Sequence, residues 1–138
     1  MLQPNQLALL FTVAMLAVTA YFLLGSIPLL ILKHDDPVDA RFIRSFYITY
    51  YRIALITATA AAVSCALAGR PALAAGAAAI AVLTWVLRGR FIPRMDTLGT
   101  QIHANDIVAI PAFRKLHKSA ILINLVQLVV ILGSLGSF

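Results

Sequence analysis

The segment FRKLHKSAILINL, residues 113–125, contains the residue best suited to acid–base chemistry. His117 stands among Lys and Arg residues, and the apolar run after it is interrupted only by Ser119 and Asn124. Because an imidazole titrates near neutral pH, His117 is the candidate catalytic residue, as a general base. The simpler expectation is a solvated imidazole, since the residue precedes an apolar helix within a cationic cluster.

A second candidate group lies in YITYYRIA, residues 47–54. Arg52 follows three tyrosines and lies about a turn and a half inside an apolar segment. An arginine at such a depth is costly in lipid and marks a binding role, unless its long side chain reaches the headgroups. The tyrosines, Tyr51 among them, are expected to stack on the guanidinium or to hydrogen-bond with it.

Further candidate binding residues lie in the second half of the chain. Arg88 and Arg94, in LRGRFIPRMDTLG, are suited to an anionic head, either of a substrate or of a lipid. Arg94 has a local alternative partner in Asp96. Asn124 and Gln127 stand one helical turn apart in an apolar run. Polar residues so placed favour hydrogen bonds between helices, although Asn124 is also suited to contact a ligand.

Several kinds of chemistry have no residues to support them. The chain has no Glu, one Cys and three His, with no HExxH and no CxxC pattern, so we predict no metal site and no cofactor. His103 and Asp106 suit one helix face, but HAND is also an ordinary helix-capping sequence. Every Asp lies in an expected loop or at a helix end, which argues against a proton-coupled transporter.

Composition sets the environment in which these residues work. Of the 138 residues, 62% are hydrophobic and 12% are charged, whereas a soluble domain is close to half apolar and a quarter charged. The chain is therefore expected to lie in a membrane. Its net charge of +6 comes from cations beside the apolar segments, so anionic lipid headgroups are the expected partner rather than nucleic acid.

Four apolar segments are long enough, the third only just, to cross the roughly 30 Å hydrocarbon core as helices. They are residues 7–32, 46–68, 72–87 and 119–135. This predicts a single all-α domain over residues 1–138, an integral membrane four-helix bundle.

Local signals mark the expected helix ends. Pro28 is expected to kink the end of the first helix. Asp36 suits the N-cap of the second helix, with Pro37 at its first position. Gly69 suits a left-handed helix end, and Pro71 suits the next helix start. GTQIHANDIVAIP, residues 99–111, is expected to form a polar break, in which Asn105 or Asp106 caps a short helix that leads into the fourth span.

Charge predicts the orientation. Four spans put both termini and the second loop on one side, where Arg70 is the only cation outside the helices. The opposite loops carry nine cations, and Arg52 lies near that face too. The nine are Lys33, Arg41, Arg44, Arg88, Arg90, Arg94, Arg114, Lys115 and Lys118. By the positive-inside rule these longer basic loops are cytoplasmic. The prediction is a multi-pass protein of a bacterial-type inner membrane, with both termini and a short loop outside.

The two ends of the bundle differ in side-chain size. Small residues dominate the outer parts of the second and third spans, TATAAAVSCALAG and PALAAGAAAIAV, and allow close helix contact. Aromatic residues gather towards the basic side. They favour an aromatic belt at the lipid interface, or else a bundle that widens to a partly polar cleft.

The order of these features resembles that of a known group. LLGSIPLL ends the first span, IPRMDTL follows the third, and AFRKLHKSAILINL opens the fourth. This is similar to the anthrone-oxygenase-like family of small four-helix membrane proteins and to the related CopD-like membrane proteins. The matching positions are Pro93, Asp96, Phe113, Leu116 and His117. Asp96 replaces a usual Asn, and Lys118 and Ser119 replace an Arg. The resemblance implies the fold, and for a few members an oxygenase acting on aromatic polyketides.

Three functions compete. The first is a non-catalytic accessory subunit of a larger membrane complex, in contact with other subunits or its own copies, or a binder of a lipid-like molecule. It predicts that His117→Ala is tolerated. The second is a cofactor-independent oxygenase-like enzyme on a hydrophobic aromatic substrate, with His117 as base and Arg52 and Arg94 stabilising the anion. It predicts lost turnover in a folded His117→Ala variant. A carrier or channel is third.

Overall fold

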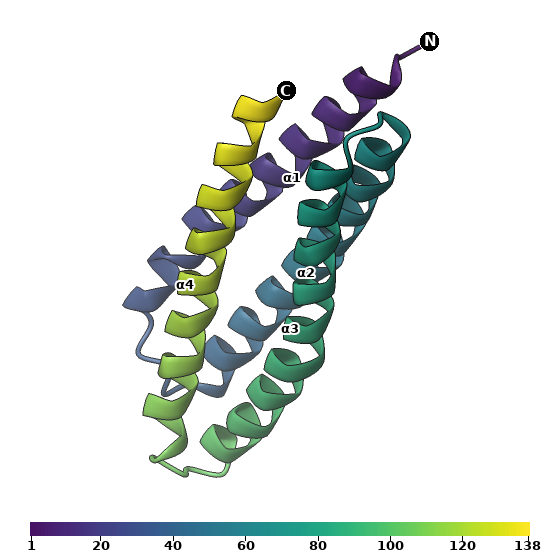
Figure 1. The fold of residues 1–138 in the computed structure, drawn as a ribbon. Helices are drawn as coiled ribbons and strands as arrows, with labels where there is room; N and C mark the ends of the chain where they lie inside the picture. Colours follow the sequence, from purple (N-terminus) through teal and green to yellow (C-terminus); the bar gives the residue numbers. More distant parts are fainter.

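The computed structural model describes all 138 residues and consists of four long α-helices (Figure 1). The helices are α1 (Pro4–Ser26), α2 (Pro37–Leu67), α3 (Pro71–His103) and α4 (Ala109–Ser134), with short 3₁₀ helices η1 (Pro28–Ile31) and η2 (Leu135–Ser137). By length and hydropathy, all four segments are able to cross a membrane. The predicted all-α four-helix architecture is confirmed, and the chain is a multi-pass membrane protein by these criteria.

The helices pack through narrow faces whose buried residues recur every three or four positions. On α1 these residues are Ala8, Thr12, Met15, Thr19, Phe22 and Ser26, and on α4 they are Phe113, His117, Ala120, Asn124, Gln127 and Ile131. This spacing is that of a left-handed helical bundle. Large apolar residues on the other faces, such as Leu24 and Val129, are exposed. In a bilayer those faces contact lipid.

The core is narrow at one end and bulky at the other. Ala58, Ala61 and Ala77 are buried together with Met15 and Ile131, so α2 and α3 approach through small residues as predicted. The opposite half of the core is built around aromatic side chains: Phe22, Tyr47, Tyr50, Tyr51 and Phe113. The belt interpretation is therefore wrong for Tyr47, Tyr50 and Tyr51, which fill the interior. Trp85, 67% exposed, remains on the lipid-facing side.

Three of the predicted helix ends are confirmed in detail. The Asp36 carboxylate accepts a hydrogen bond from the Val38 N–H at 2.8 Å, and Pro37 begins α2. Gly69 has φ +69° in the tight turn before Pro71, which begins α3. Glycine adopts this left-handed conformation without a steric cost. These ends are local features and were readable from local residue types.

Arg70 holds one end of the bundle together. Its Nε donates to the Asn5 side chain at 3.1 Å, Nη1 donates to the Ser137 carbonyl, and the guanidinium lies 5.0 Å from the Phe138 ring centroid. The N-terminus, the α2–α3 turn and the C-terminus therefore lie at the same end, as Figure 1 shows. The first and third loops, with most of the cations, lie at the other end, which is called the basic end below.

The third helix is longer than predicted. It does not end near residue 87 but continues through Pro93 to His103, so most of the expected polar break is helical. Pro93 has no N–H for the carbonyl four residues earlier, which usually ends a helix. Here Met95, Leu98 and Ile102 are buried in the aromatic half of the core, and this packing holds the helix together. Tertiary contacts override the local signal.

The start of the fourth helix and the end of the first also differ from prediction. α4 is one continuous helix from Ala109, with no separate short helix before the span. Pro111 lies in its first turn, where a missing N–H is tolerated. The Asp106 carboxylate accepts from the Val108 N–H at 3.2 Å just before the helix, close to its expected capping position. α1 ends at Ser26, and Pro28 opens η1 instead of kinking a continuous helix.

The helices extend beyond the membrane at the basic end. α2 has 31 residues and α3 has 33, which at 1.5 Å per residue gives lengths of about 46 and 50 Å. The hydrocarbon core is roughly 30 Å thick. Because their apolar parts lie towards the Arg70 end, the excess projects from the basic end, into the headgroup layer and beyond.

Candidate functional site

A chain of hydrogen bonds crosses the interior of the basic end. It joins Arg114 and His117 of α4, His34 of the loop between η1 and α2, Ser26 at the end of α1, and Tyr47 of α2. We call these five residues the histidine relay. Ser26, His34, Tyr47 and His117 are fully buried. Three helices and one loop therefore converge on a polar cluster inside the bundle.

Arg114 determines which atoms of the relay donate hydrogen bonds and which accept them. Its Nη1 donates to His34 Nδ1 at 3.2 Å and to the Leu32 carbonyl at 2.9 Å. Because a guanidinium has no acceptor, His34 Nδ1 accepts and its Nε2 carries the proton. His34 Nε2–H then donates to His117 Nδ1 at 2.9 Å, and His117 Nε2–H donates to Ser26 Oγ at 3.1 Å. Both imidazoles are neutral in this arrangement.

The inner end of the relay is a tyrosine. Ser26 Oγ is hydrogen-bonded to the Tyr47 hydroxyl. The Tyr47 ring also contacts the His117 ring at a centroid distance of 5.8 Å. The relay therefore connects the half-buried Arg114, near the surface of the basic end, to an aromatic hydroxyl in the core.

The electrostatic surroundings keep His34 uncharged. Burial lowers the pKa of His34, because the imidazolium loses its hydration, and the nearby Arg114 guanidinium lowers it further. A backbone hydrogen bond with Leu32 and the carboxylates of Asp39 and Asp35 act in the opposite direction. The net direction is down from the usual value, in agreement with the neutral imidazole that Arg114 requires.

The backbone at His34 is constrained as well. Its φ is +62°, in the left-handed region that non-glycine residues seldom adopt. Such a conformation persists only where surrounding contacts hold it. Here Arg114 binds both the His34 ring and the adjacent Leu32 carbonyl. Arg114 therefore fixes the first loop against α4.

The expectation that His117 is solvated is wrong. Its side chain is fully buried and both ring nitrogens are hydrogen-bonded. Sequence reasoning also missed His34, which lies two residues before the Asp36 N-cap and was not considered as a site residue. The two histidines are 83 positions apart, so no local pattern links them. Only the packing of the first loop on α4 brings them together.

The three predicted arginines lie apart from the relay. Arg52, Arg88 and Arg94 are all exposed, and none of them makes a hydrogen bond or ion pair with another side chain. The expected stacking of Arg52 on the tyrosines is absent. Tyr51 instead points inward, 1% exposed, with its ring 5.7 Å from that of Tyr47. The arrangement of Arg52 and Arg94 around a base at His117 is not formed.

The two predicted amides of the fourth span are buried. The Tyr50 hydroxyl donates to Gln127 Oε1 at 3.3 Å, which is the expected hydrogen bond between helices. Asn124, 2% exposed, has no partner for Nδ2, and Gln127 has none for Nε2. A buried polar hydrogen without an acceptor is costly.

A second feature lies on the outside of the basic end. A groove of about 440 Å³ separates the start of α2 from the end of α3. We call it the α2–α3 groove. Its lining residues are Asp36, Pro37, Val38, Ala40, Arg41, Arg44, Met95, Asp96, Gly99, Thr100 and His103. Charged, polar and apolar side chains all contribute, which suits an amphiphilic ligand.

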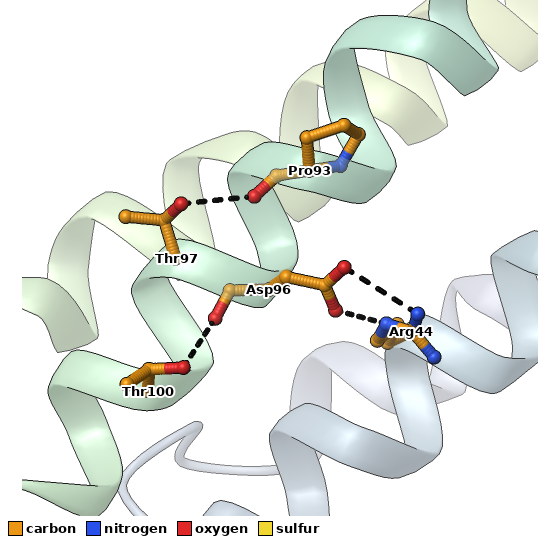
Figure 2. A network of polar contacts seen from close by, with 5 residues as sticks. All are labelled: Arg44, Pro93, Asp96, Thr97 and Thr100. Atoms are coloured by element: carbon orange, nitrogen blue, oxygen red, sulfur yellow. Dashed lines mark hydrogen bonds and ion pairs between the residues drawn. The ribbon is translucent and has the colours of Figure 1, made fainter.

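An ion pair joins the two walls of this groove. Arg44 of α2 donates from Nε and Nη2 to the two carboxylate oxygens of Asp96 on α3 (Figure 2). It is the one salt bridge in the structure. Asp96 therefore does not pair with Arg94 as considered from the sequence. Figure 2 also shows Thr97 and Thr100 donating to the carbonyls of Pro93 and Asp96, at 3.0 and 2.9 Å. The pair is partly exposed, at 38% and 49%.

No three side chains of His, Cys, Asp or Glu gather closely enough to hold a metal ion. Comparisons with family models, curated proteins and solved structures find no match to this chain. The histidine relay and the α2–α3 groove are therefore interpreted from their own geometry.

Proposed function

We propose that this small polytopic membrane protein is non-catalytic and binds a lipid-like molecule in the α2–α3 groove. The observation that carries the proposal is the groove itself, a cavity of about 440 Å³ with charged and apolar walls on a bundle that otherwise exposes mainly lipid-facing side chains. The exposed apolar side chains along all four helices support lateral contact with lipid.

The depth of the groove fits a headgroup. The apolar segment of α2 begins at Phe46. At 1.5 Å per residue, Arg44 lies roughly 3 Å and Arg41 roughly 8 Å beyond that point along the helix. The polar layer on each side of the hydrocarbon core is roughly 5–8 Å thick. Measured along α2, the inner wall of the groove is thus at headgroup level, where a lipid would enter sideways while its chains stay in the bilayer.

The experiment is native mass spectrometry of the protein extracted gently from its membrane. Leucine at Gly99, one of the lining residues, should fill the groove, and the Cβ that it adds makes only ordinary contact with Ala40, at 3.8 Å. We expect Gly99→Leu to lose retained lipid roughly tenfold, equivalent to about 1.4 kcal/mol of binding. Gly133→Leu, where a Cβ meets nothing within 4 Å, is the matched control. Equal lipid on both variants would contradict groove binding.

The same spectrum tests the accessory-subunit form of this proposal. Stoichiometric protein in the complex, or a mass of two or more copies of this chain, would support a role in a larger membrane assembly. Its support in the structure is limited to the broad apolar surface, which lipid alone is able to cover. We therefore rank lipid binding ahead of it.

An oxygenase-like enzyme is the second candidate, favoured by the neutral His117 and by the resemblance to the anthrone-oxygenase-like and CopD-like proteins. A base must reach its substrate, and His117 has no exposed surface and no free ring nitrogen. This candidate requires the first loop to open. Turnover of a hydrophobic aromatic substrate by the parent, lost in a folded His117→Gln variant, would move it to first place.

The orientation belongs to this proposal too. The concentration of cations at the basic end supports placing that end in the cytoplasm of a bacterial-type cell, with both termini outside. A reporter fused after Phe138 that is active only outside the cytoplasm tests it. Activity is expected, and an inactive, well-expressed fusion would reverse the orientation.

A further inference from the structure

The charges that line the α2–α3 groove point to a particular headgroup. We propose that the groove selects a zwitterionic lipid whose head combines a phosphate with a primary ammonium, as in phosphatidylethanolamine. This inference rests on the proposed lipid binding and narrows it to one class of lipid. It departs from the expectation, drawn from net charge, that anionic headgroups are the partner.

Charge balance inside the groove is the first argument. The lining contains two guanidinium groups, Arg41 and Arg44, and two carboxylates, Asp36 and Asp96. The two cations and the two carboxylates of the lining balance one another, although the chain as a whole carries +6. An anionic head is attracted by an excess of cations, and the groove has none. A head that carries both signs matches both sets of side chains.

The existing contacts decide which groups are free for a ligand. Arg44 and Asp96 bind one another across the groove. Arg41 is exposed and has no ion-pair partner, so its guanidinium is available for a bidentate contact with phosphate. Asp36 uses Oδ1 to cap α2, which leaves Oδ2 as an acceptor. The free pair in the groove is therefore one cation and one carboxylate, both at the start of α2.

The residue types that line the groove favour a primary ammonium over a quaternary one. A primary ammonium has three hydrogen-bond donors, and carboxylates are strong acceptors for them. A quaternary ammonium has no N–H and is recognised by the faces of aromatic rings. No Phe, Tyr or Trp lines the groove. The groove therefore favours an ethanolamine head over a choline head.

The test uses the whole protein in bilayer nanodiscs that contain phosphatidylethanolamine, phosphatidylglycerol and phosphatidylcholine with identical acyl chains, in equal amounts. Lipid retained after mild delipidation is quantified by native mass spectrometry. We expect about tenfold more phosphatidylethanolamine than either competitor, since one charge-assisted hydrogen bond contributes roughly 1.5 kcal/mol. Equal retention of the three lipids, or a preference for phosphatidylglycerol, would overturn the proposal.

Two variants assign the preference to the groove. Asp36→Asn removes the carboxylate but keeps a side chain that caps the helix equally well, so folding is preserved. It is expected to abolish the preference over phosphatidylglycerol. Arg41→Gln is expected to lower the retention of both phosphatidylethanolamine and phosphatidylglycerol. An unchanged preference in Asp36→Asn would contradict the assignment.

The outcomes separate this inference from the lipid binding on which it rests. If Gly99→Leu and Gly133→Leu retain lipid equally, groove binding itself fails. If Gly99→Leu alone loses lipid and the parent shows no headgroup preference, only the present inference fails. Glycerophosphoethanolamine, the same head without chains, is expected not to displace the lipid. Displacement at equal concentration would mean that the groove serves a soluble zwitterion, and the lipid proposal would be wrong.

Discussion

Replacing His117 with alanine is expected to lower the free energy of unfolding by about 3–5 kcal/mol. The side chain is fully buried, so its removal leaves a cavity in the basic end of the core. It also leaves His34 Nε2–H without its acceptor and Ser26 without one of its partners. A buried polar group that loses its partner costs about 1–3 kcal/mol, which accounts for a large part of the effect.

This result would replace both earlier expectations for the same variant. A solvated His117 predicts tolerance, and a catalytic His117 predicts lost turnover with the fold retained. The structure instead predicts a weakened fold whatever the function. Loss of activity in His117→Ala would therefore not identify a base. His117→Gln is the informative variant, because an amide is able to accept from His34 and to donate to Ser26 but does not titrate.

The measurement is thermal unfolding of the purified protein in detergent. Lys118→Ala, next in the chain and exposed, is the matched control and should stay within about 0.5 kcal/mol of the parent. His117→Gln should fall between the two. If His117→Ala unfolds like Lys118→Ala, the histidine is not part of a buried network, and the relay as described is wrong.

Acidification is expected to weaken the fold through His34. Because burial and Arg114 lower the pKa of His34, the unfolded chain takes up this proton at a higher pH than the folded chain. Stability is therefore constant above the unfolded value of about 6.5 and falls as the pH drops from there towards the folded pKa. The proton on His34 contributes at most about 1.4 kcal/mol per pH unit to this slope.

The structural consequence is the release of the first loop. A protonated His34 has no acceptor to offer at Nδ1, and it would place a second cation against the Arg114 guanidinium. Asp35 and Asp39 offset part of this repulsion, and His117 on the other side is able to accept but not to neutralise. Once the His34 contact is lost, only the Leu32 carbonyl still binds Arg114.

Unfolding midpoints measured from pH 8 to pH 5 at constant ionic strength test this. His34→Asn is the sharpest variant, since Asn tolerates the φ of +62°. At pH 8 this variant should be less stable than the parent, because the substitution removes the hydrogen bond to His117. Below pH 6.5 its stability should decline less steeply than that of the parent. His103→Asn, at the exposed end of α3, should keep the parent's decline. A parent profile that is flat down to pH 5 would contradict the role given to His34.

Much of the architecture was determined by the sequence alone. Four apolar runs in a chain with 62% hydrophobic residues require four helices, because a lipid environment leaves the backbone no other way to pair its polar groups. Asp36, Gly69 and Pro71 fixed helix ends by local preference. The even number of spans put both termini at one end, and the observed contacts of Arg70 agree. These properties depend on residues that are close together in the sequence.

The site was decided by the tertiary structure. In a soluble helix the polar face reveals which side is buried, but lipid is as apolar as the core, so the rotation of a membrane helix leaves a weak trace in its sequence. That rotation buried His117 and Tyr51 and left Arg52 exposed. It also set pairs far apart in the chain, His34 with His117 and Arg44 with Asp96. The length of α3 beyond Pro93 has the same origin, since packing on α2 outweighs the local cost of a proline.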